Sequence, residues 1–213
     1  AARVLSLQAN HAIEHFDVSA DGRYLAYAWN EGGYSRMTLI DRQAALDKAP
    51  AGLPAGVITA MKFDRSGTRL ALEIAPSAAP RGVYVYDPAA DALARWTSSE
   101  LGPLTAAQLV TPQPIRFPTW DRPAEGGHAL AALLYRPHGP GQHPVLIMLA
   151  DAGAGAVPLP QLDLFVQYCV NDLGLAVVAP GLRAGEAGLF DLGALLAWLG
   201  AQPDLQRDRV LLL

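Results

Sequence analysis

The chain has 213 residues, of which 51% are hydrophobic, so it can bury a substantial core within one or two domains. Its formal net charge of −4 argues against a nucleic-acid surface, which needs a clustered basic patch. No apolar run approaches the ~18 residues that span a bilayer, and a single cysteine excludes an internal disulfide and fits a reducing, cytoplasmic compartment.

The first hundred residues are rich in predicted strands and contain a repeat. The segments "FDVSADGRYLAYA" (16–28) and "MKFDRSGTRLALE" (61–73) align when Gly22 is placed on Gly67, an offset of 45 residues. Each predicts two alternating strands joined by a tight turn at its glycine. A third strand follows in each unit, at 36–41 and 82–87, and "LARWT" (93–97) supplies a fourth strand in the second unit.

Four short strands in a unit of this period indicate β-propeller blades, and two unrelated hairpins are the alternative. We expect residues 1–97 to form two blades of an incomplete ring. Propellers close with about 4–8 blades, and an open pair leaves strand edges unpaired. Either further blades precede Ala1 in a longer protein, or self-association or a partner chain covers these edges.

Residues 98–213 alternate strands with helices, as an α/β domain does. The segments 114–120 and 128–137 predict a hairpin around the polar insert 121–127. Buried parallel strands are predicted at 144–149 and 175–180, and the apolar run 210–213 predicts a further, central strand.

Two helices are predicted between these strands. The first places apolar residues at helical spacing and ends at Gly174, which suits the C′ position; its apolar residues are Leu162, Phe165, Val166, Cys169 and Leu173. The second has Asp191 as its expected N-cap and Gly200 as its end, with Leu192, Leu195, Leu196 and Leu199 on one face.

Several phrases, in this order, resemble the prolyl oligopeptidase family of serine peptidases, in particular its acylaminoacyl-peptidase and dipeptidyl-peptidase-like branch. They are "WTSSELGPL", "PIRFPTW", "ALLYRPHGPGQHPVLI", "QYCVNDLGLAVVAP" and "ALLAWLGAQPDLQRDRV". The resemblance covers nearly the whole chain. It implies propeller blades followed by the first half of an α/β-hydrolase domain, with the chain ending before the nucleophile.

In that family, the strand that matches 210–213 runs into a G-x-S-x-G elbow, and the catalytic Asp and His follow in chain order. This chain has no serine after Ser99 and no histidine after His143. No catalytic residue can therefore be assigned, and we expect the chain by itself to be inactive.

Two loops depart from the family pattern. Where the family has "HGGP", whose backbone amides help bind the oxyanion, this chain has "ADAGAGAV", which makes Asp151 and Ala152 the degenerate oxyanion-loop candidates. A carboxylate there opposes the stabilisation of a developing negative charge. Where the family has "NVRGSSGYG", this chain has "GLRAGEAG" (181–188), in which Arg183 remains. Arg183 either binds a substrate carboxylate or carbonyl, or anchors its own loop.

The remaining candidates favour structural roles. Cys169 falls on the apolar face of a predicted helix, where a buried thiol acts as a small hydrophobe and not as a nucleophile. His11 and His15 are spaced i, i+4 but lead into a strand without a third ligand nearby, so we expect surface histidines and no metal site. We expect no cofactor, since no phosphate-binding motif is present.

Two functions remain open. In the first, the chain is part of a serine peptidase that hydrolyses short peptides by acyl transfer. In the second, it is a non-catalytic pseudopeptidase that binds a peptide or a protein partner. The drifted loops 150–157 and 181–188 favour the second, and the stop at an apolar strand favours the first.

Overall fold

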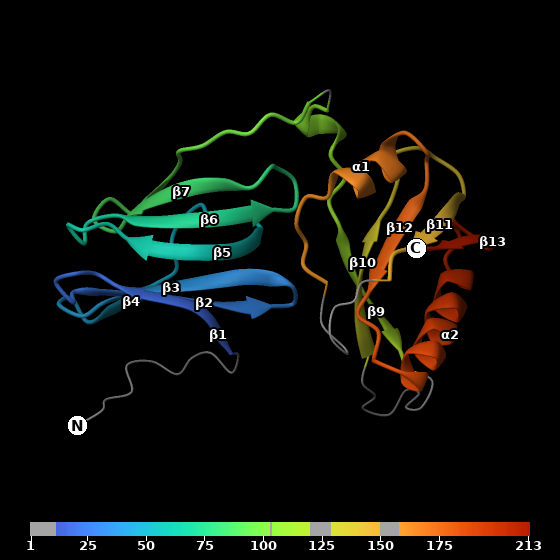
Figure 1. Cartoon of the computed structure of the whole chain (residues 1–213), viewed down its shortest axis with the longest axis horizontal. Helices are drawn as coiled ribbons and strands as arrows, with labels where there is room; N and C mark the ends of the chain where they lie inside the picture. Colours follow the sequence, from blue (N-terminus) through green and yellow to red (C-terminus); the bar gives the residue numbers. More distant parts are fainter. Residues whose placement is uncertain (1–11, 103, 120–128, 150–157) are drawn as a thin grey trace. The chain divides into compact units, whose positions relative to one another are not determined.

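The computed structural model describes residues 12–102, 104–119, 129–149 and 158–213 (Figure 1). The chain divides into two compact units, one made of residues 1–103 with 159–162, the other of 104–158 with 163–213. In the part of the chain that is described, the first unit holds two sheets, and the second holds one sheet with two α-helices.

The first unit contains two four-stranded antiparallel sheets, each with its strands in sequential order. The first repeat sheet is formed by β1 (Ile13–Val18), β2 (Tyr24–Glu31), β3 (Tyr34–Asp41) and β4 (Leu46–Lys48). The second repeat sheet is formed by β5 (Gly56–Phe63), β6 (Leu70–Pro76), β7 (Gly82–Asp87) and β8 (Ala92–Arg95). The predicted repeat of strands is confirmed, including the turns at Gly22 and Gly67, whose φ angles are 70° and 72°.

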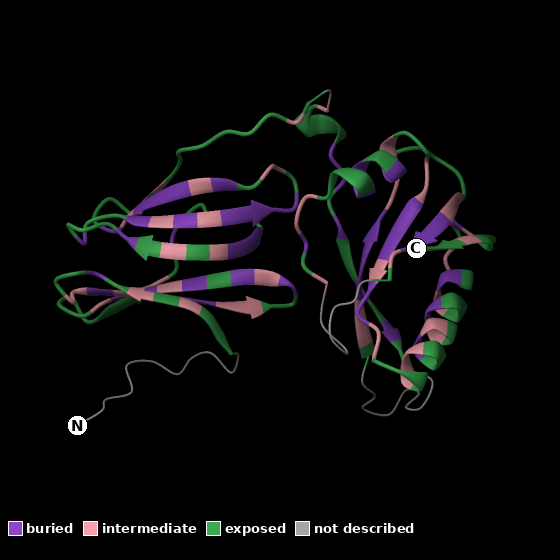
Figure 2. Ribbon diagram, viewed as in Figure 1, coloured by how far each residue is buried: buried purple, intermediate pink, exposed green. Residues whose placement is uncertain are grey.

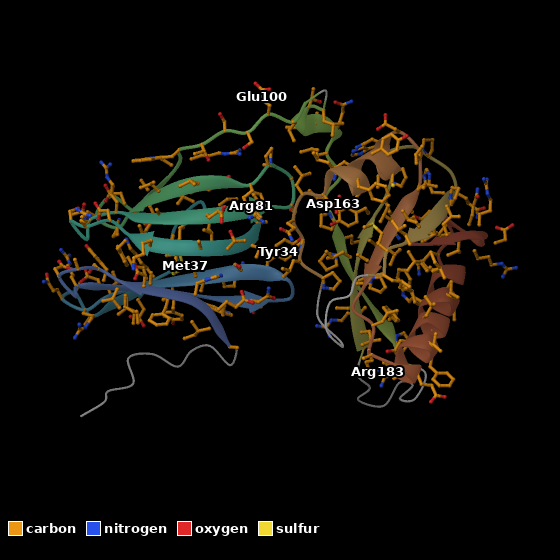
Figure 3. The ribbon with its side chains drawn as sticks, viewed as in Figure 1. Tyr34, Met37, Arg81, Glu100, Asp163 and Arg183 are labelled. Atoms are coloured by element: carbon orange, nitrogen blue, oxygen red, sulfur yellow. The ribbon has the colours of Figure 1, made fainter. Side chains whose placement is uncertain are left out.

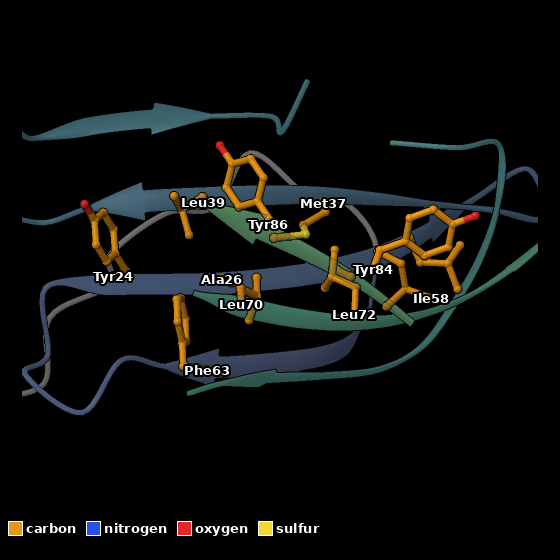
Figure 4. Close-up of a cluster of buried hydrophobic side chains, with 12 residues drawn as sticks. Tyr24, Ala26, Met37, Leu39, Ile58, Phe63, Leu70, Leu72, Tyr84 and Tyr86 are labelled. Carbon is orange, nitrogen blue, oxygen red and sulfur yellow. The ribbon is translucent and has the colours of Figure 1, made fainter. Parts of the chain in front are cut away.

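The two repeat sheets share one hydrophobic core (Figure 4). Alternate residues of β2, β3, β6 and β7 face this core, as the period of two along a strand requires. Tyr24 and Phe63 stack across it with ring centroids 6.3 Å apart. Its buried members are Tyr24, Ala26, Ala28, Met37, Leu39, Ile58, Phe63, Leu70, Leu72, Ile74, Tyr84 and Tyr86.

Polar contacts fix how the two repeat sheets stack. The carboxylate of Asp17 on β1 accepts hydrogen bonds from Lys62 Nζ at 2.8 Å and from the backbone N–H of Phe63 at 2.7 Å. The hydroxyl of Ser35 on β3 accepts the backbone N–H of Ile58 at 2.9 Å. Because these bonds join β1 and β3 to β5, they fix the position of one sheet on the other.

The second unit is built on a mixed five-stranded sheet in the order β13-β11-β12-β10-β9. Its strands are β9 (Gln113–Pro118), β10 (Ala129–Tyr135), β11 (His143–Ile147), β12 (Ala176–Pro180) and β13 (Leu205–Leu212). The predicted antiparallel hairpin of β9 and β10 and the parallel pair of β11 and β12 are confirmed. The insert 121–127 lies outside the described residues.

The helices α1 (Leu164–Asn171) and α2 (Glu186–Gly200) cover opposite faces of this sheet, because neighbouring residues of its strands belong to different cores (Figure 2). Val177 packs with α1, whereas Ala176 and Val178 pack with α2, and all three are fully buried. This explains the continuous apolar run of β12. Neither α-helix of the described chain is long and apolar enough to cross a membrane.

The predicted helix boundaries need correction. Asp191 is not the N-cap of α2, because the helix begins five residues earlier at Glu186 and Asp191 is buried inside it. Leu162 precedes α1, whose N-cap is Asp163. Leu196 is 41% exposed and does not join the buried face of α2, while the predicted end at Gly200 is confirmed.

The run 210–213 does pair in parallel with β11, but it is not a central strand in the described chain. β13 lies at the edge of the sheet, and Leu211 and Leu212 are 54% and 57% exposed. A strand becomes central only when a neighbour pairs with each of its sides, and β13 pairs with β11 alone among the described strands.

Candidate functional site

The candidate site lies where the parallel strands of the second unit end, since ligands of open α/β sheets bind beyond the carboxyl ends of the strands. The backbone pairing continues past β11: Leu149 N–H donates to Leu213 O at 2.8 Å, and Leu213 N–H donates to Ile147 O at 3.0 Å. The oxyanion-loop candidates Asp151 and Ala152 come directly after this point and lie outside the described residues.

Arg183 follows β12 and is bound by Asp191 of α2. Its Nε donates to Asp191 Oδ2 at 2.9 Å, its Nη2 donates to Oδ1 at 2.6 Å, and its backbone N–H donates to Oδ2 at 3.2 Å. Asp191 is fully buried, while the Arg183 side chain is 32% exposed. Figure 3 labels Arg183 at the lower end of the second unit in this view. The contact is bidentate, which is the preferred geometry between a guanidinium and a carboxylate.

Glycines let the chain turn from Arg183 into α2. Gly185, the N-cap of α2, has φ 66°, a left-handed conformation that favours glycine. Gly188 sits so close to the preceding loop that a Cβ there would lie 2.3 Å from the carbonyl oxygen of Arg183. The loop is therefore held at Arg183 by two parts of α2: the backbone at Gly188 and the buried carboxylate of Asp191.

Of the two roles considered for Arg183, the contacts describe an anchor of its own loop. Contact of Arg183 with a substrate stays a prediction. The sequence reasoning missed Asp191 as the partner, although a signal was available: Asp191 precedes Leu195 and Leu199 by four and eight residues, so it shares their buried helical face. A buried carboxylate requires a cation or several donors.

Cys169 is confirmed as a core residue. Its side chain is 1% exposed and packs with Val166 and Val170 against the sheet. Burial, together with the negative charge of Asp163, raises the pKa of the Cys169 thiol, which disfavours the reactive thiolate.

Gln167, two residues before Cys169 on α1, is fully buried, which the sequence does not indicate. Its Oε1 accepts the N–H of Val110 and its Nε2 donates to the carbonyl of Val110, both at 2.9 Å. The side chain thus satisfies both backbone groups of one buried residue, so its role is structural.

The histidines that the structure describes do not converge on one site. His15 lies half-exposed on β1, and His11 is outside the described residues. Both ring nitrogens of His143 face backbone carbonyl oxygens, those of Gly174 at 3.2 Å and Gly139 at 3.1 Å. Among the residues that the structure describes, no group of three His, Cys, Asp or Glu side chains could hold a metal ion.

No protein-family model and no curated protein matches the chain. Solved structures do match it. A prolyl endopeptidase, from a study of inter-domain dynamics in catalysis and specificity, superimposes with a TM-score of 0.77 and 12% identity over 98% of this chain and 32% of its own. A puromycin hydrolase gives 0.73 and 18% over 92% and 32%. Prolyl oligopeptidase B of Galerina marginata gives 0.71 and 12% over 95% and 31%.

The chain therefore spans about a third of the length of these solved structures. Identities of 12–18% show a shared fold. The resemblance inferred from the sequence phrases is confirmed at that level: the chain has the fold of the corresponding third of prolyl oligopeptidase-family peptidases.

Proposed function

We propose that this chain is the part of a prolyl oligopeptidase-like serine peptidase that joins two propeller blades to the first half of an α/β-hydrolase domain. The observation that carries the proposal is the fold shared with these peptidases over 92–98% of the chain. The two four-stranded repeat sheets would be the blades, and the mixed sheet of the second unit would be the hydrolase half. The substrates would be short peptides, cleaved by acyl transfer.

On this proposal the 213 residues alone do not hydrolyse peptides, since a nucleophilic serine and its histidine are missing after Ser99 and His143. A serine-reactive fluorophosphonate should therefore leave the 213-residue chain unlabelled. The form that the source organism produces should be labelled on a serine outside these residues, and it should cleave short fluorogenic peptides. Labelling of the 213-residue chain itself would contradict the assignment.

A second function, a pseudopeptidase that binds peptides without cleaving them, is favoured by the sequences of the loops 150–157 and 181–188, which depart from the family pattern. If the form made by the source organism binds peptides but neither reacts with the fluorophosphonate nor cleaves them, this second function replaces the first.

A further inference from the structure

The first unit contains a pocket of about 590 Å³ beside β3 of the first repeat sheet. It is lined by the end of β2, by residues 34–38 of β3 and by the linker 49–55 that leads to the second repeat sheet. Figure 3 labels Tyr34 and Met37 on this strand. The pocket belongs entirely to the first unit and is separate from the candidate site at Arg183.

One wall of the pocket is an unpaired strand edge. β4 pairs with β3 only at residues 39–41 and ends at Lys48, because Pro50 lacks the N–H that a longer ladder needs. The five residues Tyr34–Thr38 therefore have β2 on one side and the pocket on the other.

The register shows which backbone groups face this edge. Just beyond β3, Arg42 N–H donates to Arg23 O of the β2 side at 2.9 Å, so even-numbered residues point their backbone groups toward β2. The N–H and C=O of Ser35 and Met37 consequently point the other way. No backbone partner for them is found among the described residues on that side. Both residues are buried, at 6% and 2% exposure.

Buried backbone groups without partners are costly, so a ligand that pairs with them gains free energy. The ligand must present a donor and an acceptor at the spacing of alternate strand residues, about 6.8 Å, which an extended peptide does and a small polar molecule does not. The rest of the pocket suits side chains of such a peptide. Trp29 is braced by stacking on Tyr27 with centroids 5.7 Å apart, and Leu53 is half-buried.

We propose that the pocket binds an extended peptide, which pairs with Ser35 and Met37 as an added strand beside β3. The peptide is about five residues long, matching the free edge Tyr34–Thr38, and has an apolar side chain at its centre. Proline is excluded at the paired positions because it cannot donate. The exposed ion pair between Arg36 and Glu31, at 2.8 Å, lines the pocket.

The far end of the linker that lines the pocket is fixed by contacts with β6 and the residue that follows it. Ser77 N–H donates to Ala55 O at 3.2 Å and fixes the far end of the linker. Gly56 follows at a position where a Cβ would lie 2.4 Å from the carbonyl oxygen of Ala75, so the linker passes directly against β6.

The test titrates the peptide acetyl-Thr-Val-Leu-Val-Thr-amide into the 15N-labelled 213-residue chain. We expect saturable shifts of the Ser35 and Met37 amide signals. The same peptide N-methylated at its three central residues loses at least one of the two donated hydrogen bonds in every register, so it should bind at least about tenfold more weakly. Absence of saturable binding, or equal affinity of the two peptides, would overturn the proposal.

A pair of matched variants locates the site. Ala49→Trp places a large side chain in the pocket from an exposed position and should weaken binding at least about tenfold. Ala94→Trp makes the same change 45 residues later, on the exposed β8, and should bind like the parent chain. Equal effects of the two substitutions would also overturn the proposal. The outcome is independent of serine labelling, so failure here leaves the proposed peptidase assignment untouched.

Discussion

Asp191, fully buried in the middle of α2, binds the guanidinium of Arg183 through both of its carboxylate oxygens. The pair joins the loop after β12 to the helix that covers the sheet. Burial of a carboxylate in an apolar core costs free energy unless a cation compensates its charge. The stability of this part of the fold therefore depends on the contact between Asp191 and Arg183.

Removal of this charge should destabilise the second unit. Asp191→Asn is expected to lower the free energy of unfolding by about 2–3 kcal/mol, less than the ~3–5 kcal/mol for fully buried pairs, because Arg183 is 32% exposed. Urea unfolding followed by circular dichroism measures the change. Glu186→Gln, exposed in the first turn of the same helix, is the control and should change stability by less than about 1 kcal/mol. A loss no greater than that of the control would refute the anchoring role.

Two glycines of α2 should respond in opposite directions to alanine. A Cβ at Gly193 meets nothing within 4 Å, so Gly193→Ala should stabilise the helix by about 1 kcal/mol through backbone propensity. A Cβ at Gly188 would lie 2.3 Å from Arg183 O, so Gly188→Ala should destabilise by about 1–3 kcal/mol. The melting temperatures of the two variants test this. Two shifts of the same sign would show that the loop after β12 is not clamped against α2.

Acid should weaken the first unit through Asp41. The Nε and Nη2 hydrogen bonds of Arg23 lower the pKa of the Asp41 carboxyl from 3.8 to about 2. Since the folded-state pKa is the lower one, this contribution to stability is present above about pH 4 and is lost as the pH falls toward 2.

The variant Asp41→Asn should therefore be less stable at pH 7 and should lose less stability than the parent between about pH 4 and pH 2. Thermal unfolding across this range measures both effects. Asp47→Asn, which makes the same charge change on exposed β4, serves as the control. The idea fails if Asp41→Asn keeps the acid sensitivity of the parent chain.

The thiol of Cys169 should be protected. Because burial raises its pKa, the native chain should react with a disulfide reagent at pH 8 on the order of 100-fold more slowly than the unfolded chain. A cysteine placed at exposed Ala197, in a Cys169→Ala background, should react rapidly in the native state. Fast reaction of Cys169 in the native chain would contradict its assignment as a buried core residue.

The regular strands could be predicted because their signal is local. The alternation in β7 fixes its bounds as Gly82–Asp87, and the apolar run of β12 predicts burial on both faces. By contrast, β4 has the sequence "LDK" and cannot be predicted from it. A short, exposed strand with two charges carries no apolar pattern and is defined only by its pairing with β3.

The errors lie where tertiary contacts override local preference. Gly188 and Gly193 are poor helix formers and mask the start of α2, so local reasoning predicts the first Asp before the leucine pattern as the cap. The edge position of β13 depends on its neighbours rather than on its own residues. Gln167 could not be identified at all, because its partner Val110 is 57 residues away.

The contact between Asp17 and Lys62 has a consequence for the assembly of the repeats. The two side chains occupy equivalent positions, 45 residues apart, and carry opposite charges. If a second copy of the first repeat took the place of the second, two carboxylates would face each other where an ion pair now forms, and they would repel. The order of the two repeats is therefore specified by charge: the pair favours the second repeat beside the first and disfavours a second copy of the first repeat in that place.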